Sequence, residues 1–209
     1  KCQGCQEPEC VKSCPAGIDI PGFLRRMEAK NYIGAARLIR EKNPFGETCG
    51  FTCAADKLCQ QNCYRKDFTG KPVNIAELQR WVCQEAGEKG WLKREPAGKG
   101  HSVAVIGSGP SAMSCAYYLA LAGCKVSIFA IESQPGGKLL EKAAANPRLQ
   151  AALQRDIEGI LANGVTFMGS CEPLQETDLV QMRKQYSCVY ITKDQLLNPL
   201  GSDAPASLS

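Results

Sequence analysis

Residues 1–15 read KCQGCQEPECVKSCP, and this stretch decides the fold of the first part of the chain. It places cysteines at positions 2, 5, 10 and 14, the last directly before Pro15. Residues 46–63, GETCGFTCAADKLCQQNC, carry a second quartet formed by Cys49, Cys53, Cys59 and Cys63. Close runs of four cysteines whose last member precedes proline are typical of 4Fe–4S sites. The spacing therefore predicts two 4Fe–4S clusters and a role in electron transfer.

Two other uses of these cysteines stay open at this point. Zinc ligands usually come as two close Cys or His pairs per ion, and only Cys2 and Cys5 have the CxxC spacing. Disulfide frameworks suit small secreted chains, whereas this chain has 209 residues and an odd number of cysteines, 13. So many thiols indicate a reducing, anaerobic cytoplasm.

The composition excludes several classes of function. The 25 basic and 21 acidic residues leave a net charge of +4 with no basic block, which argues against nucleic-acid binding. No apolar run approaches the roughly 18 residues of a membrane span. Because Lys1 is not a methionine and directly precedes a predicted ligand, we expect further residues upstream.

Apolar residues recur at helical spacing between and after the cysteine quartets. Pro21 suits the start of a helix, and Asn43-Pro44 ends the pattern. A further helix is predicted over about 74–88. The pattern predicts a helical domain over 1–95, with these core residues before Asn43: Phe23, Leu24, Met27, Ile33, Ala36, Leu38 and Ile39.

The pattern changes after a Gly/Pro linker at 96–100. Short apolar runs predict strands at 103–106, 125–129, 166–168 and 188–192, and helices are predicted between them at 113–121, 148–163 and 177–185. Alternating strands and helices indicate a parallel doubly wound sheet. The fold class predicted is therefore α + α/β: a helical two-cluster domain, then a partial Rossmann-like domain over 101–193 and a small polar tail over 194–209.

A glycine-rich turn follows the first predicted strand. Gly107, Gly109 and Ala112 fit a dinucleotide-binding turn, in which the first two residues allow a tight turn and close approach of a pyrophosphate. The acidic residue expected at the end of the next strand is missing, since Ala130 stands there and Glu132 lies two residues on. The turn could equally be an α/β connection that binds no nucleotide.

These motifs resemble those of the glutamate synthase small subunit and, within that group, the N-terminal part of dihydropyrimidine dehydrogenase. The resemblance covers about residues 1–192, and its most specific parts are 2–15, 43–49, 53–63 and 72–79. It implies two clusters that relay electrons between a flavin and a partner's redox site. The implied first ligand set is Cys2, Cys5, Cys10 and Cys63, and the second ligand set is Cys14, Cys53, Cys59 and Gln79.

The two kinds of reasoning disagree about one residue. Spacing alone makes Cys49 a ligand and passes over Gln79, whereas the resemblance makes Cys49 a cysteine that binds no iron and Gln79 the eighth ligand. An amide oxygen is neutral and a thiolate is anionic, so the choice changes the charge and the potential of the cluster.

The resemblance also implies an FAD-binding half. The residues that it places beside FAD are Gly107, Gly109, Pro110, Ser111, Ala112, Gly136 and Gly137. The chain departs from the family's flavin contacts at Ala130, over 141–148 and at Lys193-Asp194, which replace Glu, a Gly-Ile-Pro-type stretch and a small glycine-ended turn. The family's NADPH domain and the rest of its FAD domain have no counterpart in these 209 residues.

The interpretation is an iron–sulfur subunit that relays electrons between cofactors of a multi-subunit oxidoreductase, with other redox subunits as partners and a degenerate flavin domain. The first alternative is an FAD-binding, NAD(P)H-dependent oxidoreductase component of the glutamate synthase small-subunit type. The second is a structural scaffold stabilised by clusters. No residue is predicted to be catalytic, and the expected location is the cytoplasm.

Overall fold

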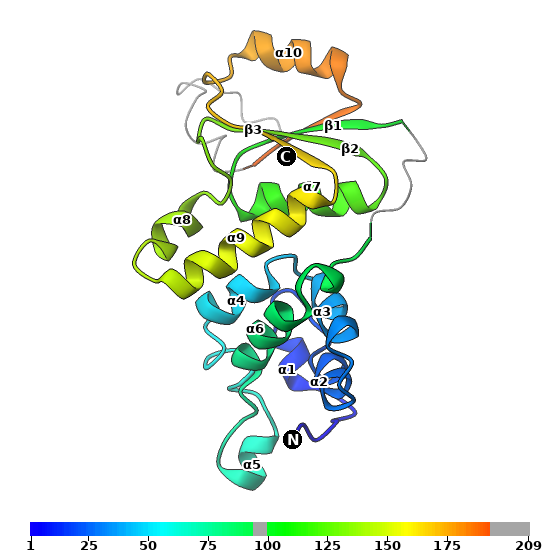
Figure 1. Cartoon of the computed structure of the whole chain (residues 1–209), viewed down its shortest axis with the longest axis vertical. Helices are drawn as coiled ribbons and strands as arrows, with labels where there is room; N and C mark the ends of the chain where they lie inside the picture. The colour runs from blue at the N-terminus through cyan, green and yellow to red at the C-terminus, as the bar shows by residue number, and fades with distance from the viewer. Residues whose placement is uncertain (94–99, 193–209) are drawn as a thin grey trace. The chain divides into compact units, whose positions relative to one another are not determined.

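The computed structural model describes residues 1–93 and 100–192 (Figure 1). The chain divides into two compact units: the first contains 1–92 and 146–159, and the second contains 93–145 and the residues from 160 on. The sequence had placed 146–159 in the second domain. Of the predicted linker 96–100 only Gly100 is described, and the predicted tail 194–209 lies outside the described residues.

The first unit is helical. Its described helices are α1 Glu9–Lys12, α2 Ile20–Glu28, α3 Tyr32–Arg40, α4 Gly46–Thr52, α5 Arg65–Thr69, α6 Ile75–Ala86, the 3₁₀ helix η1 Gly87–Gly90, and α9 Pro147–Ala162 up to residue 159. Asp19 and Asn31 cap α2 and α3 by accepting hydrogen bonds, both 2.9 Å long, from the backbone N–H groups of Gly22 and Gly34. The predicted helix over 74–88 stops at Ala86 because Gly87 takes a positive φ of 50°.

The core of the first unit confirms most of the predicted helical stripes. Ile33, also predicted for the core, is 37% exposed, because α3 buries the face that carries Ala35, Ala36 and Ile39. The core joins apolar faces of α2, α3 and α6, and four cysteines of the two ligand sets pack against it: Cys2, Cys10, Cys14 and Cys63. Among its most deeply buried members are Ile20, Phe23, Ala35, Ala36, Ile39, Ile75 and Val82. The loops that carry the cysteines are therefore anchored on a packed helical base.

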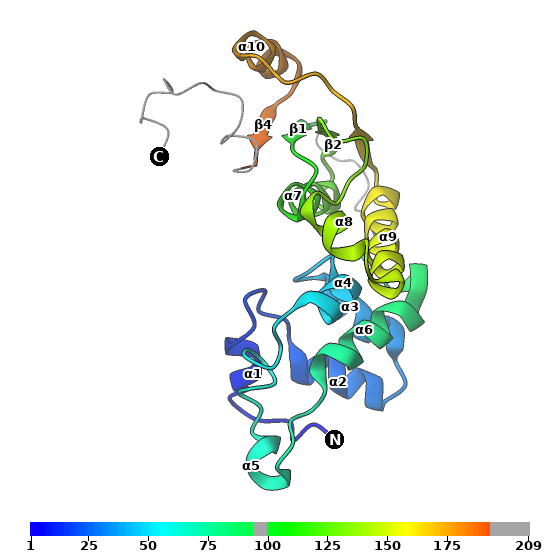
Figure 2. The same cartoon turned by 90° about the vertical axis from the view of Figure 1, so that its left-hand side faces the viewer.

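The second unit contains a four-stranded parallel sheet of order β3-β2-β1-β4, as the alternating pattern predicts. Its strands are β1 Ser102–Ile106, β2 Lys125–Phe129, β3 Val165–Met168 and β4 Cys188–Ile191, and its helices include α7 Pro110–Leu121, α8 Lys138–Ala143 and α10 Glu176–Gln185. Figures 1 and 2 show α7 and α10 on opposite faces of the sheet. The order matches the first half of a Rossmann fold, which confirms the predicted α + α/β class.

Both faces of this sheet are covered. Ala104 and Ile106 of β1 pack with Met182 of α10, and the Phe129 ring meets the Tyr186 ring edge-on at 5.9 Å. The alternate residues Val103 and Val105 are also buried, as period-two alternation in a strand covered on both sides requires. Within the described part of the chain, no helix is both long and apolar enough to cross a membrane.

Candidate iron–sulfur site

The first ligand set lies around one pocket in the first unit. Cys2, Cys5, Cys10 and Cys63 all line it, although Cys63 is more than fifty residues from the other three in sequence. Cys10 comes from α1, and Cys63 stands just before α5. The rest of the lining includes Pro8, Pro21, Tyr64 and Arg65. The pocket thus unites one cysteine of the second quartet with three of the first, which is the grouping that a single four-thiolate cluster needs.

The pKa of Cys10 fits a thiol that loses its proton only when a metal ion binds. Burial, together with the neighbouring thiols of Cys63 and Cys2, raises the pKa of Cys10 to about 12. The Cys10 thiol therefore stays protonated at neutral pH, because its thiolate would be poorly solvated and repelled by nearby sulfurs. Bound iron would reverse this preference and release its proton.

Three members of the second ligand set also influence one another. Burial, together with the nearby thiols of Cys53 and Cys14, raises the pKa of Cys59 to about 11. Cys53 is the C-cap residue of α4, while Cys14 and Cys59 come from loops. The structure therefore brings cysteines from both quartets together a second time.

Gln79, the fourth member of this set, is a buried residue of α6 with a fixed orientation. Its Nε2 donates a hydrogen bond of 2.8 Å to the carbonyl oxygen of Gly46. Since the amide nitrogen is engaged, the carbonyl oxygen is the end of the side chain that can act as a ligand. Its place as the fourth ligand stays a prediction of the resemblance.

Cys49, the competing candidate, is held in a different way. Its sulfur accepts a hydrogen bond of 3.1 Å from Asn43 Nδ2, while Asn43 Oδ1 accepts one of 3.0 Å from the Phe45 N–H. Burial raises the pKa of Cys49 despite the hydrogen bond from Asn43, and the nearby thiols of Cys53 and Cys14 raise it as well. Cys49 is half-buried and lies near two members of the second ligand set, so its exclusion from that set stays a prediction of the resemblance.

Within 1–93 and 100–192, no three Cys, His, Asp or Glu side chains are arranged to hold a single metal ion. A zinc site needs four ligands within about 2.3 Å of one atom, so its sulfurs must be close together.

A buried ionic group in the first unit was not foreseen from the sequence. Asp156 of α9 is fully buried, and its Oδ2 accepts hydrogen bonds of 2.8 Å from both the N–H and the Oγ1 of Thr48. Arg40 Nη2 lies 3.8 Å from Asp156 Oδ1. Arg155 donates to the buried Glu47 carboxylate through Nε at 3.1 Å and Nη2 at 2.5 Å. Partners 108 residues apart leave no pattern in the sequence that could have revealed them.

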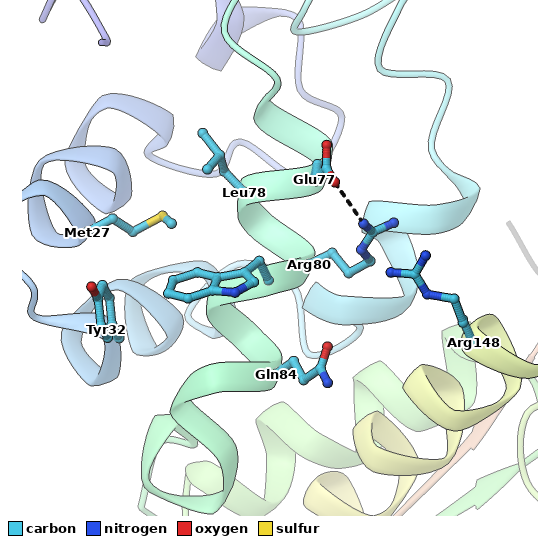
Figure 3. A pocket seen from close by; sticks show the side chains of 8 residues that line it. Met27, Tyr32, Glu77, Leu78, Arg80, Gln84 and Arg148 are labelled. Atoms are coloured by element: carbon cyan, nitrogen blue, oxygen red, sulfur yellow. Dashed lines mark hydrogen bonds and ion pairs between the residues drawn. The ribbon is translucent and has the colours of Figure 1, made fainter.

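Figure 3 shows a separate groove along the exposed side of α6, with Met27, Tyr32 and Leu78 on one side and Arg80 and Arg148 on the other. The Tyr32 and Trp81 rings meet edge-on, with centroids 5.1 Å apart. Arg80 lies over the Phe51 ring at 4.4 Å and pairs with Glu77 at 3.3 Å. No cysteine lines this groove, so it is distinct from the places where the two ligand sets gather.

The two predicted cofactor turns of the second unit lie against each other. The Gly136 N–H donates a hydrogen bond of 2.7 Å to the Ser108 carbonyl oxygen. A Cβ on Gly137 would lie 2.9 Å from the Gly109 Cα, and one on Gly107 would lie 2.3 Å from Thr192 Oγ1. Gly109 is the N-cap of α7, whose first helical residues include the predicted Pro110, Ser111 and Ala112. Both glycine turns are thus built as the dinucleotide pattern requires.

The end of β2 lacks the other half of that pattern. Ala130 is buried, its N–H donates to the Met168 carbonyl, and its own carbonyl accepts from the Cys171 N–H. Beyond it, the Glu132 carbonyl accepts from the Ser170 N–H, so this segment runs on along the end of β3. No carboxylate stands at the strand end to accept hydrogen bonds from a ribose. The described residues fit the pyrophosphate end of a dinucleotide and not its ribose.

Two known families match parts of the chain, and the second match extends past residue 145 into the part of α9 that belongs to the first unit. Residues 1–91 match the family described as dihydropyrimidine dehydrogenase domain II, 4Fe-4S cluster, and residues 105–154 match an NAD(P)-binding Rossmann-like domain. The sequence is 32% identical to the NAD-dependent dihydropyrimidine dehydrogenase subunit PreT homolog of Salmonella typhi, over 98% of this chain and 49% of that protein.

Two further relatives come from Escherichia coli strain K12. The putative oxidoreductase YgfK is 35% identical over 87% of this chain and 17% of that protein. The glutamate synthase [NADPH] small chain is 29% identical over 91% of this chain and 41% of that protein. The chain spans about half the length, or less, of the curated relatives that it matches.

Proposed function

The chain belongs to the family of the glutamate synthase small subunit and the N-terminal part of dihydropyrimidine dehydrogenase, and on this premise we propose that it relays electrons through two 4Fe–4S clusters. The relay would connect the cofactors of other subunits in an oxidoreductase complex. The relatives' names describe oxidoreductases, and one names a subunit of a dehydrogenase.

The observation that carries the proposal is the pocket lined by Cys2, Cys5, Cys10 and Cys63. Spacing alone would have divided these residues between two sites, yet they gather around one. The proposed ligands of the other cluster are Cys14, Cys53, Cys59 and Gln79. When bound, each cluster would supply a carrier of single electrons.

The protein's own contribution is to hold the clusters in position, to separate them from water and to set their reduction potentials. The core of α2, α3 and α6 holds the cysteine loops in place and keeps water away from their inner sides. The hydrogen bond from Gln79 Nε2 to the Gly46 carbonyl leaves the amide oxygen as the atom that would bind the second cluster. Burial and hydrogen bonds around the ligands set the potential of a bound cluster. Nothing in this role requires a catalytic acid, base or nucleophile.

A cysteine variant pair tests the proposal. Cys14→Ala should remove about half of the iron and acid-labile sulfide, because it takes one of four ligands from the second set only. Cys49→Ala is the matched control and should keep the full amount, since that thiol is held by Asn43. Iron and sulfide analysis after anaerobic purification gives the answer. Unchanged iron in Cys14→Ala, or loss of iron in Cys49→Ala, would contradict the ligand assignment.

A second candidate function is favoured by the paired glycine turns of the second unit. An FAD-binding, NAD(P)H-dependent oxidoreductase component would use the turns at Gly107–Gly109 and Gly136–Gly137 for the pyrophosphate. It would need a ribose acceptor that β2 does not supply, because Ala130 stands at its end. Extraction of flavin from the purified protein decides between the candidates: one FAD per chain supports the second, and no flavin supports the simple relay.

A further inference from the structure

The α5 segment, residues 64–71, follows directly on the ligand Cys63 and projects from the first unit. Figures 1 and 2 show α5 at the end of this unit, away from α2, α3 and α6. No extensive contact joins α5 to another described helix. Since Tyr64 and Arg65 also line the pocket of the first ligand set, the segment is both a wall of that pocket and a protrusion.

The segment presents aromatic side chains to solvent. Phe68 is 78% exposed, the highest value among the exposed large hydrophobic residues of the described chain, and Tyr64 is 43% exposed. The two residues are four positions apart across the α5 turn, so their side chains lie on the same side of it. Neither belongs to the core of the first unit. They form an aromatic patch that begins at the pocket wall and ends at the tip of the segment.

The backbone that carries this patch is firmly braced. Arg65 Nη1 donates to the carbonyl oxygens of Lys71 and Pro72 at 2.9 and 3.1 Å. Thr69 Oγ1 donates to the Lys71 carbonyl at 3.0 Å, and Gly70 closes the turn in the left-handed region with a φ of 69°. Single exposed hydrophobic residues are common on surfaces and need no explanation. The α5 segment differs from that case, because its hydrogen bonds hold two aromatic rings exposed together beside the pocket of the first ligand set.

The α5 segment itself carries a net positive charge. Its eight residues include three basic side chains, Arg65, Lys66 and Lys71, and one acidic side chain, Asp67. Both lysines are exposed. A basic rim around exposed aromatic rings complements a partner that has an apolar recess rimmed by carboxylates. The small size of the patch suits a brief encounter, since weak redox contacts occupy the low end of interface areas.

We propose that the α5 segment, with Phe68 at its tip and Lys66 and Lys71 beside it, is the docking surface for an acidic redox protein that exchanges electrons with the cluster of the first ligand set. The inference rests on the proposed function. In the encounter the acceptor gains one electron, the chain loses one, and no bond forms. Electron transfer falls steeply with distance, and this surface adjoins the pocket itself.

The test uses the whole chain with its clusters and oxidised cytochrome b5 as the probe, an acidic haem protein with an exposed haem edge. The chain is reduced with dithionite, freed of excess reductant and mixed anaerobically, and the haem absorbance reports the second-order rate constant. We expect Phe68→Ala to slow the reaction about tenfold, as loss of an aromatic hot spot does. The double change Lys66→Glu with Lys71→Glu should slow it at low salt and flatten its dependence on ionic strength.

Trp81→Ala is the matched control, because Trp81 is also an exposed aromatic residue, at 42%, and lines the groove on α6. It should react at the wild-type rate. Wild-type rates for Phe68→Ala, or loss of rate in Trp81→Ala alone, would overturn the proposal and move docking to the groove. Iron content and circular dichroism of each variant are measured first. A wild-type chain without iron contradicts the proposed function, whereas fully loaded variants with unchanged rates contradict only the docking surface.

Discussion

As the proposed eighth ligand, Gln79 would decide the charge of the second ligand set. Its side chain is buried in α6, and the 2.8 Å hydrogen bond from Nε2 to the Gly46 carbonyl leaves the amide oxygen as its available ligand atom. A set of three thiolates and one neutral amide holds one negative charge fewer than a set of four thiolates. Less negative charge around a cluster stabilises its reduced form and raises its reduction potential.

We therefore predict that Gln79→Cys keeps the iron content and lowers the midpoint potential of one cluster by tens of millivolts or more. The other cluster, with its four thiolates already in place, serves as an internal control. A redox titration followed by electron paramagnetic resonance measures both. An unchanged or higher potential in Gln79→Cys would show that Gln79 is not a ligand.

At the scale of elements, the contact between α4 and α6 is set by two glycines. A Cβ on Gly50 would lie 2.6 Å from the Arg80 Cβ and 2.7 Å from the Ala76 carbonyl oxygen, and one on Gly46 would lie 2.8 Å from Cys83 Sγ. The backbones of the two helices can approach because neither position has a side chain. Since Cys53 is the C-cap of α4 and Gln79 lies in α6, this contact would control whether the two proposed ligands reach the same cluster.

The second prediction follows from that contact. Gly50→Ala should lower the free energy of unfolding by about 1–3 kcal/mol through overpacking and should remove about half of the iron. Gly34→Ala in α3 is the control for iron content, because its new methyl group would displace the Asn31 side chain that caps α3, a helix without a proposed ligand. It should also lower the free energy of unfolding, through loss of the cap, but keep the full iron content. Urea unfolding and iron analysis measure the two effects. Full iron loading in Gly50→Ala would contradict the coupling of helix spacing to the second ligand set.

The ionic contacts of α9 with α3 and α4 give a third prediction, on pH. Burial raises the pKa of Asp156 from 3.8 to about 7, against the opposing effects of the Thr48 N–H and Arg40. The folded protein thus holds this proton more tightly than the unfolded chain does. The stabilisation of the folded protein by this bound proton is complete below about pH 4. It is lost as the pH rises to about 7, at up to about 1.4 kcal/mol per pH unit.

Asp156→Asn removes the titrating group and leaves Arg40, Glu47 and Arg155 in place. The unfolding free energy of the wild type minus that of Asp156→Asn should therefore fall from pH 5.5 to 7 and level off above pH 8, because only the wild type loses stability as the carboxyl ionises. Urea unfolding at constant ionic strength measures it. A difference that grows with pH would mean that Asp156 is ionised in the folded protein and paired with Arg40.

At the scale of the whole molecule, the sequence predicted single helices and strands better than it predicted which cysteines come together in the fold. Continuous apolar runs such as 103–106 have few alternatives to a buried strand, and β1 indeed spans Ser102–Ile106. The spacing of cysteines, by contrast, puts Cys14 with Cys10 and leaves Cys63 in the other quartet. Which thiols share a pocket depends on how the loops pack on α2, α3 and α6, and only the family resemblance gave that grouping.

The place of residues 146–159 was also beyond the sequence. Their helix was predicted, but its membership of the first unit depends on the pairs Arg155–Glu47 and Asp156–Thr48, which join distant positions without any periodic signal. The buried Ala130, in contrast, was identified from its position at the end of β2. Sequence patterns report local periodicity well and long-range polar pairing poorly.

The central claim, that this chain holds two 4Fe–4S clusters, is tested most directly by iron and sulfide analysis with Mössbauer spectroscopy on anaerobically purified protein. The account predicts about eight iron and eight sulfide atoms per chain, all in four-iron clusters. Four irons or fewer in fully folded protein, or zinc in place of iron, would contradict it.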